Sequence, residues 1–566
     1  MADTIRWRRR LLYAVVALAA LAALTYWFFH AGVLMKGDVV FHLNRIMGIA
    51  SGLAAGDFPV YVHGFQMQGY GTLDGALYPD LLLYFPAALI ASGVPLAVSY
   101  HVYWIFVTSL GFCAAWRGYA LLSGRRYLGL LAALLFSSCY FLPFCLGMSA
   151  GAYVACFFLP YAAGALFALL RRADGARYWL ELVLAFAVIA GSHVITTIFC
   201  LLALPLCLFL WRRGLREAER RRALLLAAVA SLALSLSRLV PFAYFYAQVD
   251  FHIRHAVLPS LSSLTSSLAD LAAAQFWWGW PLLALLFGAL FSRALRRRRA
   301  FLATVACAIL FTAGIWSGFP WQAIESIPPL GSVLPLFQFP MRLVPLALVP
   351  LAYFLARFLA AASRCLPCLP RDCRRRARGL SLLLALLCAA YGIQAAEHLD
   401  FTMGGYRCVW QPSYVALDAQ SLPSFGAGVQ PDYLYADVDP VSLFASGAVP
   451  RPGEVRSLSG DVALRSYRKV GTRLLFTYAS TSGAEVMVPL FSYPGYTAHV
   501  DGTEIPAREG ANHVLTLALP PGEHTVFVAY RGPLAFRVSV CVSLLAFFLL
   551  SGKALRLWCR GRNRDV

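Results

Sequence analysis

Twelve long apolar stretches constrain this chain more than any other feature of its sequence. A membrane core about 30 Å thick needs roughly 20 apolar residues of helix, and about 17 are enough for a short span. Of the 566 residues, 60% are hydrophobic and only 13% are charged, so a water-soluble enzyme is excluded. The predicted spans are 11–29, 95–116, 127–147, 152–170, 179–190, 194–211, 223–246, 276–291, 301–316, 343–359, 379–396 and 534–550.

Basic residues lie in short clusters between these stretches, which is typical of a polytopic membrane protein. With both termini in the cytoplasm, 33 of the 48 Lys and Arg fall in cytoplasmic segments and 9 fall in a polar region at 397–533. The net charge of +21 therefore marks topology and does not indicate a nucleic-acid partner. We expect a multi-spanning domain over 1–396 and a final helix with a basic cytoplasmic tail over 534–566.

Six cations remain in or near the outer half of the membrane, where the positive-inside bias would not place them. They are Lys36, Arg45, Arg238, Arg254, Arg342 and Arg537. Arg238 lies inside an apolar span, which costs at least about 2.5 kcal/mol unless the side chain snorkels or finds an anion. Snorkelling is the simpler interpretation. The alternative is that Arg238 and other outer Arg and His side chains meet a lipid phosphate, which suits the fork geometry of Arg.

The first outer loop, 30–80, is long, aromatic and rich in acids. Asp38 precedes an apolar-periodic run to Leu53 and is predicted to cap a helix there. Residues 38, 42 and 45 are spaced i, i+4 and i+7, so a carboxylate, an imidazole and a guanidinium share one helix face. The competing interpretation is a plain cap, with His42 and Arg45 solvating the membrane surface. The following apolar segment, 81–90, is predicted to lie beside the membrane rather than cross it.

Short motifs in this loop resemble bacterial membrane glycosyltransferases of the GT-C superfamily, in particular YfhO-like proteins and the membrane proteins named after 6-pyruvoyl-tetrahydropterin synthase. Nothing in the chain resembles a soluble pterin enzyme. The sequence departs from the family at Pro79-Asp80, where the family has a Tyr-Pro-Pro or similar run. The matching residues are 37–38, 41–45, 53, 56–59, 69–71, 78–79, 192–193, 338–342, 493–496, 500–502 and 519–525.

The resemblance implies a polytopic α-helical membrane protein that transfers a sugar from a polyprenyl-phosphate donor to a cell-envelope glycan, teichoic acid or glycolipid. It implies that Asp38 is the catalytic carboxylate. A base must take the acceptor proton, and cations must stabilise the departing phosphate. The expected phosphate partners are His42, Arg45, His193, Arg238, His252, Arg254, His255 and Arg342. Asp74, Tyr78, Asp80 and Gln338 are expected to line the cleft.

Metal use is left open by the sequence. Mg²⁺ or Mn²⁺ is compatible with Asp38, but one carboxylate and one His do not specify a metal site. In a cytoplasmic segment, Cys365, Cys368 and Cys373 resemble zinc ligands, yet a nearby fourth ligand is missing. No cofactor is therefore assigned.

The region 397–533 differs in composition from the rest, with 13 of the 27 acidic residues and frequent Gly, Pro and Ser. It is predicted to form an extracytoplasmic β-sandwich, with Asp501-Gly502 as a hairpin turn. The predicted strands are 474–478, 485–489, 497–500, 513–518 and 525–530.

Three other functions remain open from the sequence. A lipid-linked sugar flippase or transporter usually shows internal repeats and a midplane site, and neither is visible here. A metal-independent envelope polymer ligase would rely on Arg and His and tolerate loss of Asp38. A non-catalytic scaffold would present only the β-domain.

Overall fold

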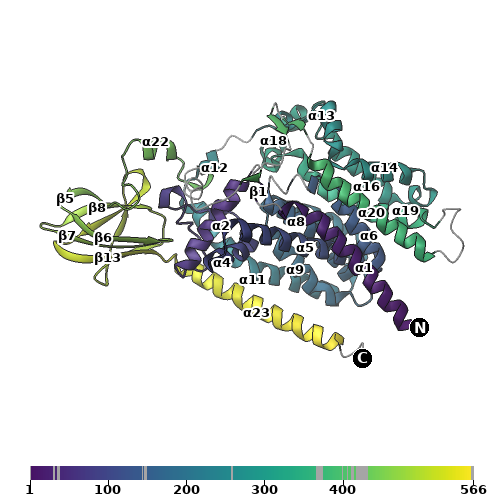
Figure 1. The fold of residues 1–566 in the computed structure, drawn as a ribbon, viewed down its shortest axis with the longest axis horizontal. Helices are drawn as coiled ribbons and strands as arrows, with labels where there is room; N and C mark the ends of the chain where they lie inside the picture. Colours follow the sequence, from purple (N-terminus) through teal and green to yellow (C-terminus); the bar gives the residue numbers. More distant parts are fainter. Residues whose placement is uncertain are drawn as a thin grey trace. The chain divides into compact units, whose positions relative to one another are not determined.

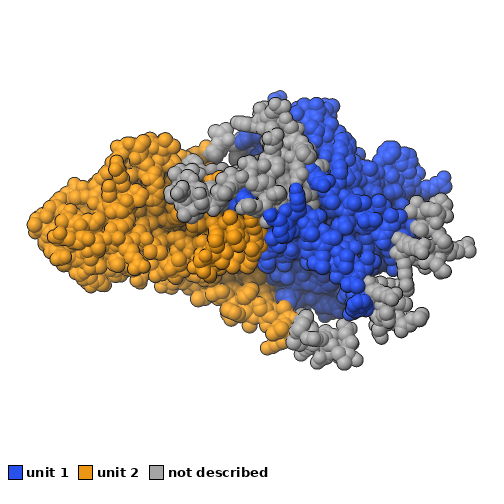
Figure 2. Space-filling model, viewed as in Figure 1, with its two compact units in different colours: residues 1–37, 104–229, 257–415 blue, residues 38–103, 230–256, 416–566 orange. Residues whose placement is uncertain are grey.

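The computed structural model describes most of the chain (Figure 1). The chain splits into two compact units (Figure 2). The described residues are 2–29, 32–34, 38–139, 141–142, 145, 149–255, 259–364, 374–397, 400–403, 406–409, 414–415 and 431–562. Unit 1 comprises Met1–Gly37, Trp104–Val229 and Val257–Val415. Unit 2 comprises Asp38–Tyr103, Ala230–Ala256 and Ala416–Val566.

The described residues of unit 1 form helices and two short strand pairs. Its longer helices are α1 (Ala2–Thr25), α6 (Arg126–Ser137), α8 (Ala150–Arg171), α9 (Trp179–Ala190), α10 (Val194–Leu210), α14 (Trp280–Leu290), α16 (Arg299–Ala313), α19 (Val344–Ala362) and α20 (Arg374–Glu397). Two further helices, α5 (Leu96–Ser123) and α11 (Ala218–Gln248), contribute to both units. The strands are β1 (Val33–Leu34) with β4 (Tyr414–Val415), and β2 (Asp400–Met403) with β3 (Tyr406–Val409).

A helix overlaps each of the twelve predicted apolar stretches. The predicted break in the long apolar run near residue 192 is confirmed, because α9 ends at Ala190 and α10 begins at Val194. Within the described residues, five helices are long and apolar enough to cross a membrane, so the chain is a multi-pass membrane protein. They span Leu96–Ser123, Ala150–Arg171, Ala218–Gln248, Pro340–Ala362 and Leu534–Arg556.

Glycine lets two helices of unit 1 approach closely. A Cβ at Gly164 of α8 would lie 2.2 Å from the carbonyl oxygen of Gly118 in α5. Between the same helices, the hydroxyls of Thr108 and Tyr153 lie 3.2 Å apart. Lipid tails offer no hydrophobic driving force for helix association, so small residues and hydrogen bonds take over that role.

Unit 2 combines the first loop with the C-terminal region. Its helices are α2 (Val39–Ala54), α3 (Asp74–Leu77), α4 (Tyr84–Ala91), α12 (His252–His255), α22 (Pro440–Ala445) and α23 (Leu534–Arg562). At eight residues, α4 is too short to cross a membrane, in keeping with the prediction for 81–90.

Two antiparallel sheets form the C-terminal β-region. One has the strand order β10-β9-β13-β7-β6 and the other β11-β12-β8-β5. The hairpin prediction is confirmed, because Val500 pairs with Thr503 and both Asp501 and Gly502 have positive φ. The strands are β5 (Arg456–Gly460), β6 (Ala463–Val470), β7 (Arg473–Ser480), β8 (Ala484–Phe491), β9 (Tyr496–Val500), β10 (Thr503–Ile505), β11 (Ala507–Glu509), β12 (Val514–Leu519) and β13 (Gly522–Tyr530).

The first loop and the β-region share one hydrophobic core. Tyr70 and Leu73 are fully buried in the same cluster as Phe476 and Phe491. The amide of Phe491 donates to the carbonyl of Tyr70 at 3.2 Å, and the Tyr70 hydroxyl donates to the carbonyl of Pro450. Unit 2 thus contains both the first loop and the β-region.

Candidate functional site

The N-terminal half of α2 carries the polar face predicted from the sequence. Asp38 is the cap residue of α2, and its backbone carbonyl accepts the His42 amide at 3.0 Å. Its half-buried carboxylate accepts no capping hydrogen bond from the described first turn. One and two turns later, His42 Nδ1 and Arg45 Nη1 lie 3.4 Å apart, so the predicted shared face brings these two side chains together.

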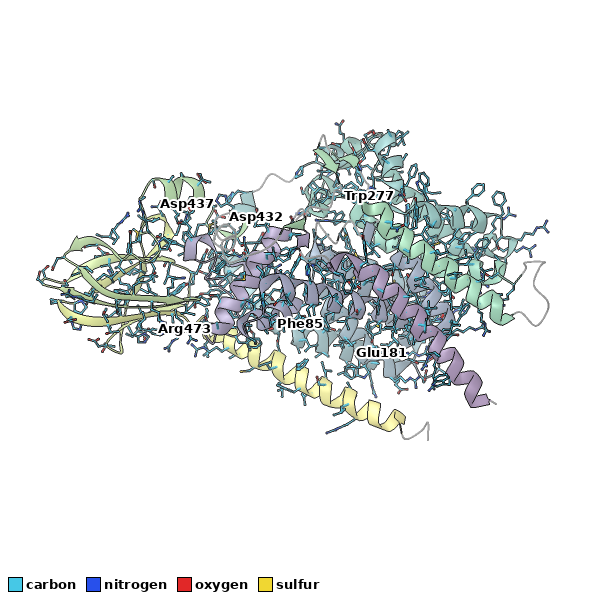
Figure 3. The ribbon with its side chains drawn as sticks, in the orientation of Figure 1. Phe85, Glu181, Trp277, Asp432, Asp437 and Arg473 are labelled. Carbon is cyan, nitrogen blue, oxygen red and sulfur yellow. The ribbon has the colours of Figure 1, made fainter. Side chains whose placement is uncertain are left out.

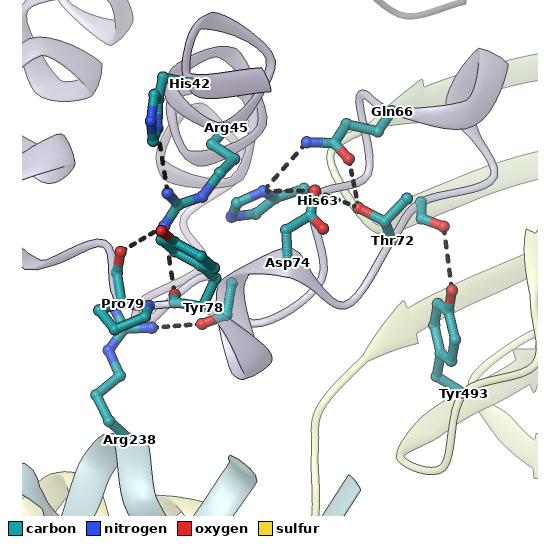
Figure 4. Close-up of polar contacts among 12 residues, drawn as sticks. His42, Arg45, His63, Gln66, Thr72, Asp74, Tyr78, Pro79, Arg238 and Tyr493 are labelled. Atoms are coloured by element: carbon teal, nitrogen blue, oxygen red, sulfur yellow. Dashed lines mark hydrogen bonds and ion pairs between the residues drawn. The ribbon is translucent and has the colours of Figure 1, made fainter. Parts of the chain in front are cut away.

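Arg45 is buried, and one of its terminal nitrogens binds two backbone carbonyls. Its Nη2 donates to the carbonyl of Pro79 at 2.6 Å and to that of Tyr78 at 3.3 Å, and its guanidinium lies 4.5 Å from the Tyr78 ring centroid (Figure 4). Only 1% of the residue is exposed. Burial lowers the pKa of Arg45, while Tyr78 and Asp74 act in the opposite direction. Arg45 therefore fixes the backbone at 78–79.

Arg238 reaches the same loop segment from α11. Its Nη1 donates to the carbonyl of Gly75, and its Nη2 forms an ion pair with Asp80. The Asp80 side chain is fully buried, and that of Arg238 is one quarter exposed. Two guanidiniums from two helices thus bind the segment 75–80 (Figure 4).

A second buried cluster surrounds Asp74. The Thr72 hydroxyl lies 2.5 Å from Gln66 Oε1 and 3.0 Å from Asp74 Oδ2, and His63 Nδ1 lies 4.0 Å from Asp74 Oδ2 (Figure 4). Burial raises the pKa of Asp74 to about 6. One hydroxyl carries one hydrogen, so a protonated Asp74 donating to Thr72 satisfies both short contacts at once.

Nothing in the sequence marks this second cluster beyond Asp74. His63, Gln66 and Thr72 are polar residues in a Gly- and Tyr-rich stretch, and only folding brings them to the carboxylate. The pairing is local, since the His63 amide donates to the Thr72 carbonyl at 2.8 Å. Burial lowers the pKa of His63 well below its ordinary value, so its imidazole is neutral at pH 7.

Of the predicted residues after α11, His252 contacts the segment 434–438, and the other two contact residues near the end of α11. His252 donates its amide to the Leu434 carbonyl at 3.1 Å, and its Nε2 lies 2.8 Å from the Val438 carbonyl. His255 Nε2 lies 2.7 Å from Asp250, and Arg254 Nη1 lies 3.9 Å from the same carboxylate. Arg254 and His255 are exposed, in contrast to Arg45.

The remaining predicted residues lie in unit 1. His193 caps α10, where its Nδ1 accepts the Thr196 amide at 3.2 Å. Arg342 donates to Gln338 Oε1 and is close enough to His193 to act on its ring electrostatically. Gln338 has a φ of +63°, a conformation that costs a non-glycine residue free energy. The structure thus brings His193, Gln338 and Arg342 together as a separate polar group.

A metal site finds no support within the described part of the chain, where no three His, Cys, Asp or Glu side chains gather. The motif at Cys365, Cys368 and Cys373 lies outside the described residues.

No protein-family model matches the chain, and no curated protein matches it either. Among solved structures, it is similar to the arabinofuranosyltransferase AftD from mycobacteria (TM-score 0.43, 19% identity, 68% of this chain and 26% of that one). It is also similar to the Archaeoglobus fulgidus oligosaccharyltransferase (TM-score 0.40, 13% identity, 71% of this chain and 56% of that one). A third similar structure is ArnT from Cupriavidus metallidurans bound to undecaprenyl phosphate (TM-score 0.40, 12% identity, 90% of this chain and 97% of that one). The chain spans about a quarter of the first relative and just over half of the second. At these scores the likeness carries no inference about activity.

Proposed function

We propose that this protein is a membrane glycosyltransferase of the GT-C type, which moves a sugar from a polyprenyl-phosphate donor to a cell-envelope acceptor. The observation that carries the proposal is the polar face of α2, where Asp38 precedes the contacting pair His42 and Arg45. A half-buried carboxylate at the start of a helix that carries a buried cation two turns later, in a multi-pass membrane protein, fits a base acting at a membrane surface.

In the proposed reaction, the hydroxyl oxygen of the acceptor attacks the anomeric carbon of the sugar. Asp38 accepts the proton of that hydroxyl during the attack. The new carbon–oxygen bond forms while the bond to the phosphate oxygen breaks, and polyprenyl phosphate leaves with the bonding electrons. A single displacement inverts the anomeric centre. Cations that lie near the departing phosphate lower the barrier, because they stabilise charge that grows in the transition state.

The cations differ in how they serve this step. Arg45 and Arg238 already bind loop carbonyls and Asp80. We propose two alternative sets of cations for the donor phosphate: one is Arg342 with His193, and the other is Arg254. We assign positioning roles to the other three histidines: His42 contacts Arg45, His252 contacts the Val438 carbonyl, and His255 contacts Asp250.

The charge pattern supports the orientation of the chain. Basic clusters between the apolar stretches favour both termini in the cytoplasm of a bacterial cell, with the first loop and the β-region outside. The acceptor would then be a glycan, teichoic acid or glycolipid of the envelope.

The deciding experiment replaces Asp38 by Asn in purified protein reconstituted with lipid-linked sugars, after mass spectrometry of envelope glycans with and without the gene has identified the sugar. We expect turnover to fall by about three orders of magnitude, within the range for loss of a general base, while thermal unfolding stays near that of the wild type. Asp174→Asn is the matched control, because its carboxylate pairs with Arg177 at an exposed site.

Full turnover in Asp38→Asn would exclude the proposed base and favour a ligase that relies on Arg and His. Transport of the lipid-linked sugar without transfer would instead identify a flippase.

A further inference from the structure

One turn of α11 is completed by side chains from other parts of unit 2. Pro241 lacks an amide hydrogen, so the carbonyl of Ser237 has no helical donor four residues ahead. The hydroxyl of Tyr61, in the first loop, donates to this carbonyl at 3.0 Å. A partly buried carbonyl left without a donor would destabilise the fold, so Tyr61 provides the hydrogen bond that Pro241 cannot.

The same turn receives a second hydroxyl, from α23. The Ser543 hydroxyl donates to the Ala233 carbonyl at 2.9 Å and accepts the Ser237 amide at 3.0 Å. Ser543 thereby binds the same two backbone groups that an α-helix joins to each other. We call the segment from Ala233 to Pro241 the bridged turn, because the Tyr61 and Ser543 side chains satisfy its backbone.

Arg238 extends from the bridged turn into the first loop. It binds the Gly75 carbonyl and pairs with Asp80. The segment between these residues is also bound by Arg45, whose helix begins after Asp38. A continuous set of contacts therefore connects the bridged turn, the segment 75–80 and the polar face of α2.

We propose that the bridged turn is the docking point of the first loop, and that Tyr61, Arg238 and Asp80 are positioning residues for the reaction of Asp38. The proposal rests on the proposed function. It assigns Arg238 to the loop and not to the donor phosphate, because both its Nη1 and its Nη2 contact loop groups.

Tyr61→Phe tests the proposal, because it removes one hydroxyl and leaves the ring against Phe536. We expect kcat to fall about tenfold, equivalent to about 1.4 kcal/mol in the barrier, with KM for the donor little changed. Amide hydrogen exchange in 72–80 should become faster. The matched control is Tyr119→Phe, which removes a buried hydroxyl that donates to the Val349 carbonyl at 3.1 Å.

Adding Pro241→Ala to Tyr61→Phe separates positioning from stability. The new amide at 241 can donate to the Ser237 carbonyl, so the thermal midpoint should recover. Turnover should stay low, because the loop still lacks the Tyr61 contact with α11. Recovery of both quantities would overturn the proposal, since Tyr61 would then act only through stability.

Two further outcomes are distinguishable. Unchanged kcat and unchanged exchange in Tyr61→Phe would overturn the docking point itself. If the wild type shows no glycosyl transfer, the proposed function fails, whereas faster exchange at 72–80 in Tyr61→Phe but not in Tyr119→Phe would still establish the docking of the loop.

Discussion

The two ends of the first loop use the same kinds of side chain in different ways. At the start of the loop, Asp38 is half-buried at the N-terminus of α2. At its end, Asp74 and Asp80 are each only 1% exposed and are surrounded by protein groups. A carboxylate near solvent can exchange a proton with a substrate, whereas a buried one is committed to its partners.

The guanidiniums show the same contrast. Arg238 and Arg45 bind the backbone of 75–80, while Arg254 is exposed beside Asp250. Residue type alone predicts phosphate binding for all three. Burial and existing partners separate the loop-binding cations from those that remain able to meet a ligand.

Breaking the ion pair between Arg238 and Asp80 gives the largest expected effect on stability. Asp80→Asn leaves the Arg238 charge without its counter-ion, and we expect unfolding to become easier by about 3–5 kcal/mol, as for other buried pairs. The measurement is thermal or denaturant unfolding in detergent. The double variant Asp80→Leu, Arg238→Met should recover much of the loss, because it removes both charges. A single variant as stable as the wild type would contradict the importance of the pair.

The pH dependence of the free energy of unfolding tests the burial of Asp74. Burial raises the pKa of Asp74 to about 6, so between pH 4 and 6 the folded state binds more protons than the unfolded state. Stability should therefore fall as pH rises through this window, by at most about 3 kcal/mol, and then level off. Asp74→Asn should remove this slope while keeping a hydrogen-bonding group near Thr72. Unfolding profiles with the same slope in both proteins would contradict the shifted pKa.

Arg342→Ala tests whether Arg342 binds the donor phosphate, in contrast to Arg45 and Arg238, which bind the loop. We expect KM for the lipid-linked donor to rise about tenfold, the effect of about 1.4 kcal/mol in binding, with little change for the acceptor. Gln338→Ala is the companion variant, because it removes only the side chain that accepts from Arg342. Donor titration showing an unchanged apparent affinity in Arg342→Ala would reject its assignment to the phosphate.

The smallest effect is expected where the loop meets the β-region. Arg473 at the start of β7 (Figure 3) pairs with Asp57 at 2.9 Å, but 42% of its side chain is exposed. Asp57→Asn should therefore cost at most about 1 kcal/mol in unfolding. The exposed pair of Asp174 and Arg177 supplies the comparison. A loss of several kcal/mol in the free energy of unfolding would show that Asp57 behaves like the buried carboxylates Asp74 and Asp80.

Much of the local structure could be predicted from the sequence. The break between α9 and α10, the short α4 and the hairpin at Asp501-Gly502 follow from length and turn chemistry. The contact of His42 with Arg45 follows from helical spacing. These features depend on residues close together in the chain.

The partners of the site residues could not be predicted in the same way. Arg238 and Asp80 are 158 positions apart, and Tyr61 and Ser237 are 176 apart. Spacing in the sequence does not select such pairs, because many Asp and Tyr residues have the required chemistry. The pairs form where packing leaves a buried charge or carbonyl that needs a partner.

The sequence by itself determined that the chain enters a membrane, where its helices break and which strands follow, because hydrophobic length and turn geometry are local properties. Only the tertiary structure decided which acids and cations are buried in pairs and which stay near solvent. The cost of burying a charge depends on neighbours from distant segments, and those neighbours are chosen by the fold.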